Sequence, residues 1–196
     1  MIMKTTAIIS GILFFLFLGS QIFFYMSSNN IEEYSYSVIK DYEGFEIRKY
    51  ESSLFTSIKL KTGSYSAASG KGFSILGGYI FGNNKKNESI SMTSPVAMTL
   101  EKESTMMFLV PKEYNKESLP IPENKDIQFI QVPEKMIAAI TFGGWANDKK
   151  IQNNKIRLKN LLDKKGIKYT NNFSVLGYNP PYEILFRRNE VIVELE

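Results

Sequence analysis

The chain closes on YNPPYEILFRRNEVIVELE, residues 178–196, and this stretch decides the fold class. Val191, Val193 and Leu195 point to one side of the segment, and Glu190, Ile192 and Glu194 point to the other. Such alternation with a period of two is typical of a β-strand that buries one face. The two adjacent arginines just before it lie on opposite faces and therefore have separate roles. We expect the chain to end on a strand that completes a sheet.

Upstream, residues 34–60 alternate in the same way and contain the turn sequence DYEG, so they predict antiparallel strands joined by short turns. Two segments have a helical pattern instead of this alternation. Residues 64–80 have helical spacing, although four glycines weaken the pattern. These glycines indicate either close packing on a sheet or the close approach of a ligand. Residues 147–165 carry an apolar stripe with a period near 3.6, and Gly166 suits the end of this second helix.

The order of these elements repeats. Each half of the sequence runs strand, glycine turn, helix, loop, strand, proline, strand. Two such halves predict an α+β domain in which duplicated β-α-β-β units form an antiparallel, barrel-like sheet with two helices. We expect this domain to span residues 31–196 and to leave a groove for a ligand between sheet and helix.

Composition excludes several classes of function. The 196 residues include neither His nor Cys, so a Ser-His-Asp triad, a thiolate nucleophile and His or Cys metal sites are ruled out. The net charge of +4 arises from 24 basic and 20 acidic side chains, a balance too even for a nucleic-acid binder. We predict a monomer that binds no nucleic acid, and no metal or catalytic residue is assigned.

The N-terminal region is a separate segment. Residues 5–26 carry no charge, and a helix of this length would span a hydrocarbon core of about 30 Å. We therefore predict a transmembrane helix, with residues 1–30 as membrane anchor and linker. Because Lys4 precedes the segment, the C-terminal domain is expected outside the cytoplasm. The alternative is a cleaved signal peptide with an apolar core at residues 7–18.

Over roughly residues 33–196 the chain resembles the SOUL haem-binding proteins. The matching pieces, in order, are YEGFEIRKYE, YIFGNN followed by ISMTSPVAMT, MMFLVPKEY, LPIP, FGGWA and GYNPPYEILFRRNEVIVEL. The resemblance implies binding of haem or a related tetrapyrrole in an apolar depression near the first helix, with basic groups near the propionates. Transferred by position, the site would consist of Lys71, Phe73, Leu76, Tyr79, Ile80 and Met92.

The iron in such a site would have no histidine ligand, because this chain has none. Met92 and Tyr79 are possible ligands by chemistry, but both also fit as core residues. We expect a haem held without an axial protein ligand. Three functions remain open: a non-catalytic binder of haem, a binder of another hydrophobic molecule or lipid in the same groove, and a hydrolase that works without histidine.

Overall fold

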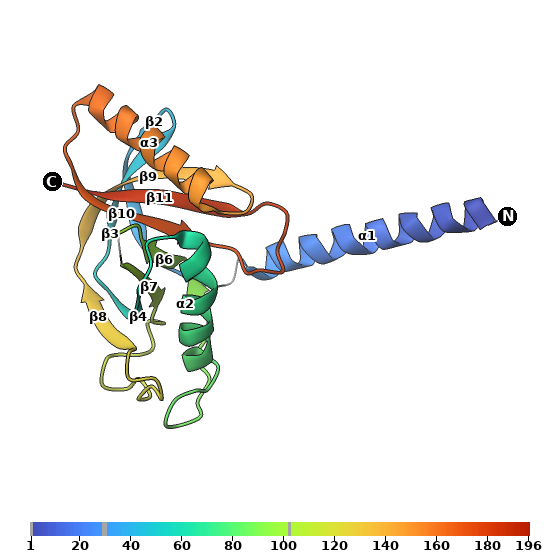
Figure 1. The fold of residues 1–196 in the computed structure, drawn as a ribbon, viewed down its shortest axis with the longest axis horizontal. Coiled ribbons are helices and arrows are strands. Elements are labelled where there is room, and N and C mark those ends of the chain that lie inside the picture. The colour runs from blue at the N-terminus through green and yellow to red at the C-terminus, as the bar shows by residue number, and fades with distance from the viewer. Residues whose placement is uncertain (1, 29–30, 102) are drawn as a thin grey trace.

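The computed structural model describes residues 2–28, 31–101 and 103–196, and Figure 1 shows their arrangement. Three helices are α1 (Ile2–Ser28), α2 (Tyr65–Ile80) and α3 (Asp148–Lys165). The strands are β1 (Glu32–Glu33), β2 (Tyr36–Tyr42), β3 (Phe45–Tyr50), β4 (Ser53–Leu60), β5 (Thr93–Ser94), β6 (Val96–Thr99), β7 (Ser104–Leu109), β8 (Gln128–Val132), β9 (Lys135–Gly143), β10 (Tyr169–Gly177) and β11 (Arg188–Leu195).

Nine strands form one antiparallel sheet in the order β2-β3-β9-β11-β10-β6-β7-β4-β8. The predicted α+β class and antiparallel sheet are confirmed. The order also repeats: β4-α2-β6-β7 and β9-α3-β10-β11 are equivalent units related about the β6–β10 pair. The last strand, β11, lies inside the second unit between β9 and β10. The sheet is open at β2 and β8, and β1 and β5 add a short parallel pair outside it.

The ends of α2 and α3 coincide with residues that favour helix termini. The side chain of Ser64 caps α2, and the side chain of Asn147 caps α3. Asp148, in the first turn of α3, also reaches the start of α2, where its carboxylate accepts the Tyr65 N–H at 2.7 Å. Gly166 ends α3 with φ of 66°, a left-handed conformation that glycine adopts without strain.

Apolar side chains cover both faces of the sheet. One core lies between the sheet and both α2 and α3, and includes Leu76, Leu158 and Leu162. A second, smaller core covers the opposite face, which we call the helix-free face. Its buried members are Tyr34, Tyr50, Phe55, Ala97, Leu109, Ile137, Ala139, Leu176 and Ile192. The residues that point away from the helices in β11 and β3 are therefore interior residues, not surface residues.

Within the described residues, no helix combines the length and apolar character needed to cross a membrane. This finding contradicts the transmembrane helix predicted over 5–26, so the single-pass membrane localisation and the membrane partner are wrong with it. Gln21 of α1 is buried, and its side-chain oxygen accepts the Ile184 N–H at 2.8 Å. This part of α1 therefore binds the protein's own loop. Residues 1, 29 and 30 of the predicted 1–30 segment lie outside the described residues.

Candidate functional site

Three of the predicted site residues lie on the side of α2 that faces the sheet. Leu76, Tyr79 and Ile80 are buried members of the core between sheet and helices. The Tyr79 hydroxyl donates to the Pro120 carbonyl oxygen at 2.9 Å. Burial raises the pKa of Tyr79, and Tyr114 adds to this effect. Because tyrosine ligates iron as the anion, this raised pKa makes Tyr79 a poor axial ligand.

The other three predicted residues are more accessible. Phe73 is half-buried, and its ring centroid lies 5.4 Å from that of Phe108 on β7. Met92 is half-buried at the edge of the same core, and Lys71 is exposed on α2. Five of the six predicted residues thus lie on α2, but they occupy different sides of this helix.

The glycines of α2 fall into different classes. A Cβ atom at Gly72 would lie 2.8 Å from Met106 Sδ and 2.9 Å from Leu60 Cδ1, so this glycine permits close packing on the sheet. A Cβ atom at Gly77 would lie 3.5 Å from the Phe73 ring and 3.9 Å from that of Phe81, which is 62% exposed. Gly77 itself is buried, so its lack of a side chain allows these two rings to pack against the helix backbone.

A cleft of about 410 Å³ lies along α2, where the second half of the helix meets the segment before β8. This volume falls in the range of small-molecule sites, about 300–1,000 Å³. Ile75, Tyr79 and Ile127 supply its apolar wall. Lys71 precedes Ile75 by one helical turn and so lies on the same side of α2. The remaining lining residues are polar or glycine: Ser74, Gly82, Asn83, Asn87, Glu123 and Asn124.

The first of the two terminal arginines fixes the loop before β11. Arg187 donates to the Pro180 carbonyl oxygen (2.8 Å) and to the Asn179 carbonyl oxygen (3.1 Å). Its guanidinium carbon lies 4.0 Å from the centroid of Trp145, a stacking geometry that favours arginine over lysine. Arg187 therefore fixes this loop both by hydrogen bonds to its backbone and by stacking on Trp145.

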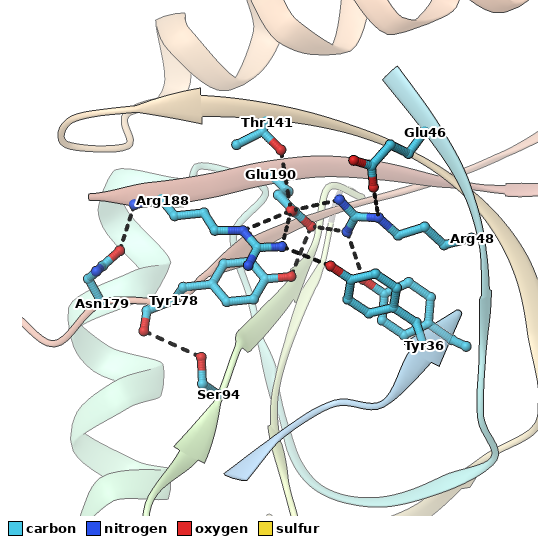
Figure 2. Close-up of polar contacts among 10 residues, drawn as sticks. Tyr36, Glu46, Arg48, Ser94, Thr141, Tyr178, Asn179, Arg188 and Glu190 are labelled. Atoms are coloured by element: carbon cyan, nitrogen blue, oxygen red, sulfur yellow. Dashed lines mark hydrogen bonds and ion pairs between the residues drawn. The ribbon is translucent and has the colours of Figure 1, made fainter. Parts of the chain in front are cut away.

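The second arginine belongs to a charged cluster on the helix-free face, shown in Figure 2. Glu190 on β11 is 0% exposed and receives two bonds from Arg48 on β3, Nη1 to Oε2 at 2.8 Å and Nη2 to Oε1 at 3.1 Å. Arg188 Nη2 donates to Glu190 Oε1 at 2.7 Å, and the Tyr178 hydroxyl donates to Oε2 at 2.9 Å. Arg188 also stacks on Tyr178 at 3.9 Å. We call Arg48, Arg188 and Glu190 the buried triad.

Charges within the triad hold it ionised. Burial alone would raise the pKa of Glu190, but hydrogen bonds and charge from Arg48 and Arg188 outweigh burial and lower it. Burial raises the pKa of Tyr50 to about 12, and the Glu190 charge adds to this effect. The pKa of Tyr178 is raised well above its ordinary value for the same two reasons. Both phenols therefore remain neutral: Tyr178 donates to the Glu190 carboxylate, and the Tyr50 oxygen accepts from Arg48.

Sequence reasoning missed this triad because Glu190 was assigned to a polar, outward face of the last strand. The helix-free face is instead covered by its own core, so the alternation marks two buried faces. A signal was present: Tyr34, Tyr36, Tyr50 and Tyr178 all lie on that side of their segments. Among the described residues no group of three or more acidic side chains could hold a metal ion.

The sequence model of a family described as "SOUL heme-binding protein" matches residues 31–194. Heme-binding protein 1 of Xenopus laevis is 28% identical over 160 residues, which cover 78% of this chain and 84% of that protein. Heme-binding protein 2 of Mus musculus is 29% identical over 156 residues, which cover 75% and 76% of the two chains.

Solved structures share the fold. The EcmrR C-terminal domain has a TM-score of 0.60 at 11% identity, covering 82% of this chain and 98% of that domain. A hydrolase from Listeria innocua has a TM-score of 0.56 at 7% identity, covering 78% and 91% of the two chains. At these identities the likeness concerns the arrangement of strands and helices alone.

Proposed function

Because this chain belongs to the SOUL heme-binding protein family, we propose that it is a non-enzymatic binder of haem or a related tetrapyrrole. The observation that carries the proposal is that the family match extends over residues 31–194, the whole of the sheet and both helices that pack on it. Two relatives that match three quarters or more of this chain are named as heme-binding proteins, which supports the same ligand.

The cleft along α2 is the place we propose for the macrocycle. Ile75, Tyr79 and Ile127 offer it an apolar wall, and Phe73 with Phe81 extends the apolar surface on the neighbouring side of the helix. Burial of the flat ring stabilises the complex by about 25 cal/mol per Å² of apolar area removed from water. The residues predicted from the resemblance contribute unequally, since Leu76 and Ile80 act as the support on which α2 rests.

The side chains near the cleft also determine which charge can meet the propionates of the ligand and whether the protein can ligate its iron. Lys71 is exposed one turn before Ile75, so its ammonium group is available to a propionate of the ligand. No histidine exists in the chain, and Tyr79 is held neutral by burial and by its bond to Pro120. We therefore propose that contact with the ring, and not an axial bond, provides most of the affinity, and that iron stays open to added imidazole.

A pair of matched substitutions tests this proposal. Ile75→Asp places a charge in the apolar wall, whereas Ile156→Asp makes the same change at an exposed position of α3. Haemin titration followed by absorption should show at least a tenfold loss of affinity for Ile75→Asp, equal to about 1.4 kcal/mol, and no loss for Ile156→Asp. Leu76 is unsuitable for this test because it is fully buried and its replacement by Asp would unfold the domain.

Two outcomes would contradict the proposal. If the parent protein fails to bind haemin and metal-free protoporphyrin, the proposed ligand class is wrong. If haemin binds to the parent and to both variants with equal affinity, the ligand lies outside the cleft. Circular dichroism of each variant confirms that the fold is intact before the titration is interpreted.

A further inference from the structure

The nine-stranded sheet is open at β2 and at β8, and the two open edges differ in composition (Figure 1). β2 carries Lys40 and Asp41, and its register with β3 shifts between Val38 and Lys40. Charged side chains and bulges are features that prevent an edge strand from pairing with another chain. β8, with the sequence QFIQV, contains no charge and no proline and pairs with β4 in unbroken register. The residues of β8 therefore lack the features that protect the β2 edge.

The hydrogen bonds of β4 determine which main-chain groups of β8 point away from the sheet. The Leu54 carbonyl oxygen accepts an N–H from the residue after β7 at 2.9 Å, so the main chain of Leu54 faces β7. Main-chain groups of successive strand residues alternate in direction, so Phe55 faces β8, where it pairs with Ile130. The N–H and C=O groups of Phe129 and Gln131 consequently point outward. They have no hydrogen-bond partner among the described residues.

Apolar side chains reach the open edge on both faces of β8. Phe129 is half-buried on the helix side, and its ring centroid lies 6.0 Å from that of Tyr79. Ile130 and Val132 are half-buried at the rim of the core on the helix-free face. Cross-strand pairs of such side chains stabilise a sheet, so a further strand would cover the parts that these residues leave exposed.

One register pairs these outward groups with the same groups of a second copy of the chain. In an antiparallel arrangement about a twofold axis at Ile130, Phe129 lies opposite Gln131 of the second copy. This register engages both outward residues of β8 in hydrogen-bonded pairs. The two Ile130 side chains then face each other on the helix-free face. A surface that pairs with itself in this way forms a closed dimer.

We propose that β8 is the interface of a symmetric homodimer, in which two sheets join edge to edge about Ile130. Because β8 has five residues, strand pairing alone buries less than the about 1,200–2,000 Å² of a stable interface. The dimer is therefore transient and is populated at high protein concentration. It differs from the monomer expected from the sequence, and it is a property of the sheet edge that does not depend on tetrapyrrole binding.

Single cysteines test this register, because the chain contains none of its own. The two Ile130 Cα atoms would lie about 4.5 Å apart, within reach of a disulfide. Two Gln131 residues would be offset along the strands by two positions, beyond the limit of about 7 Å. Under mild oxidation of the full chain, we expect Ile130→Cys to cross-link at least tenfold more than Gln131→Cys. Ile39→Cys, an exposed position on the β2 edge, should resemble Gln131→Cys.

A proline provides the matched disruption. Gln131→Pro removes an N–H that points outward and no hydrogen bond to β4, so it should abolish the cross-linking of Ile130→Cys while circular dichroism stays unchanged. Equal cross-linking of Ile130→Cys and Gln131→Cys would indicate random collision and overturn the proposed register. Absence of cross-linking in a folded Ile130→Cys variant would overturn the dimer.

Hydrogen exchange of the unmodified chain tests the dimer without any substitution. Pairing covers the amides of Phe129 and Gln131, which should exchange severalfold more slowly when the protein concentration rises from about 10 μM to about 1 mM. The Tyr36 amide is the reference: the Ser35 carbonyl oxygen accepts the Glu51 N–H, so the next residue faces away from β3 at the other edge. Rates at Phe129 and Gln131 that are independent of concentration would show that β8 remains unpaired, and the proposal would fail.

Discussion

Replacing Glu190 by glutamine should destabilise the domain strongly. The side chain is fully buried and holds Arg48, itself 2% exposed, through two bonds of 2.8 and 3.1 Å. The neutral amide leaves the Arg48 charge buried without its main counter-charge. Removing one partner of such a pair costs roughly 3–5 kcal/mol. For a domain of this size each kcal/mol lowers Tm by about 2–4 °C, so we expect a fall of roughly 10 °C.

Urea unfolding followed by circular dichroism measures the loss, with Glu194→Gln as the control. Glu194 lies on the same strand and face but is only partly buried, so its replacement should change the free energy of unfolding by under about 0.5 kcal/mol. Equal effects of the two substitutions would refute the reasoning. A double replacement of Arg48 by Met and Glu190 by Leu should restore much of the stability, because no unpaired charge then remains.

The ion pair between Arg48 and Glu190 also predicts that the stability of the domain depends on pH. The folded-state pKa of Glu190 lies below its ordinary value, although burial acts in the opposite direction. Its stabilising contribution is therefore fully present above the unfolded pKa, about 4.3, and is lost as the pH falls through the folded pKa. The difference in stability between the parent and Glu190→Gln should narrow in that acidic range and stay constant above about pH 6.

Two other substitutions test separate contacts: the hydrogen bond between the starts of α2 and α3, and the stacking of Arg187 in the loop before β11. Asp148→Ala removes the acceptor of the Tyr65 N–H and should cost about 1 kcal/mol in urea unfolding. Hydrogen bonding with Ser66 lowers the pKa of Asp148, so the difference in unfolding free energy between the parent and Asp148→Ala should disappear as the pH falls through the folded pKa. A difference that stays constant with pH would contradict the role of the Asp148 carboxylate as hydrogen-bond acceptor. Arg187→Ala should increase acrylamide quenching of the single tryptophan, Trp145, and unchanged quenching would refute the stacking contact.

Periodicity predicted the helices well because each of them buries one stripe. Ile151, Leu158 and Leu162 are buried as the 3.6-residue spacing requires, and Gly166 ends α3 in the left-handed conformation. The repeated order of elements also predicted the paired units of the sheet. These features depend on residues close in sequence, so a single sequence carries the information.

The buried triad could not be predicted in the same way. Arg48 and Glu190 are 142 residues apart, and their contact depends on β3 and β11 both flanking β9. A glutamate in an alternating strand indicates a solvent-facing side unless both faces of the sheet are known to be covered. On α2, Leu76 was predicted as part of a ligand depression, and the structure places its side chain beneath the helix, in the core against the sheet.

The strand order has a consequence for the independence of the two repeated units. β3 precedes the first unit in sequence but pairs with β9 of the second, and β8 precedes the second unit but pairs with β4 of the first. The outer strand of each unit therefore comes from the part of the chain that precedes the other unit. A chain cut in the loop near Leu119 would give two fragments, each lacking its outer strand. The fragments should remain largely unfolded apart and regain the sheet only when mixed, so the domain behaves as one cooperative unit despite its internal repeat.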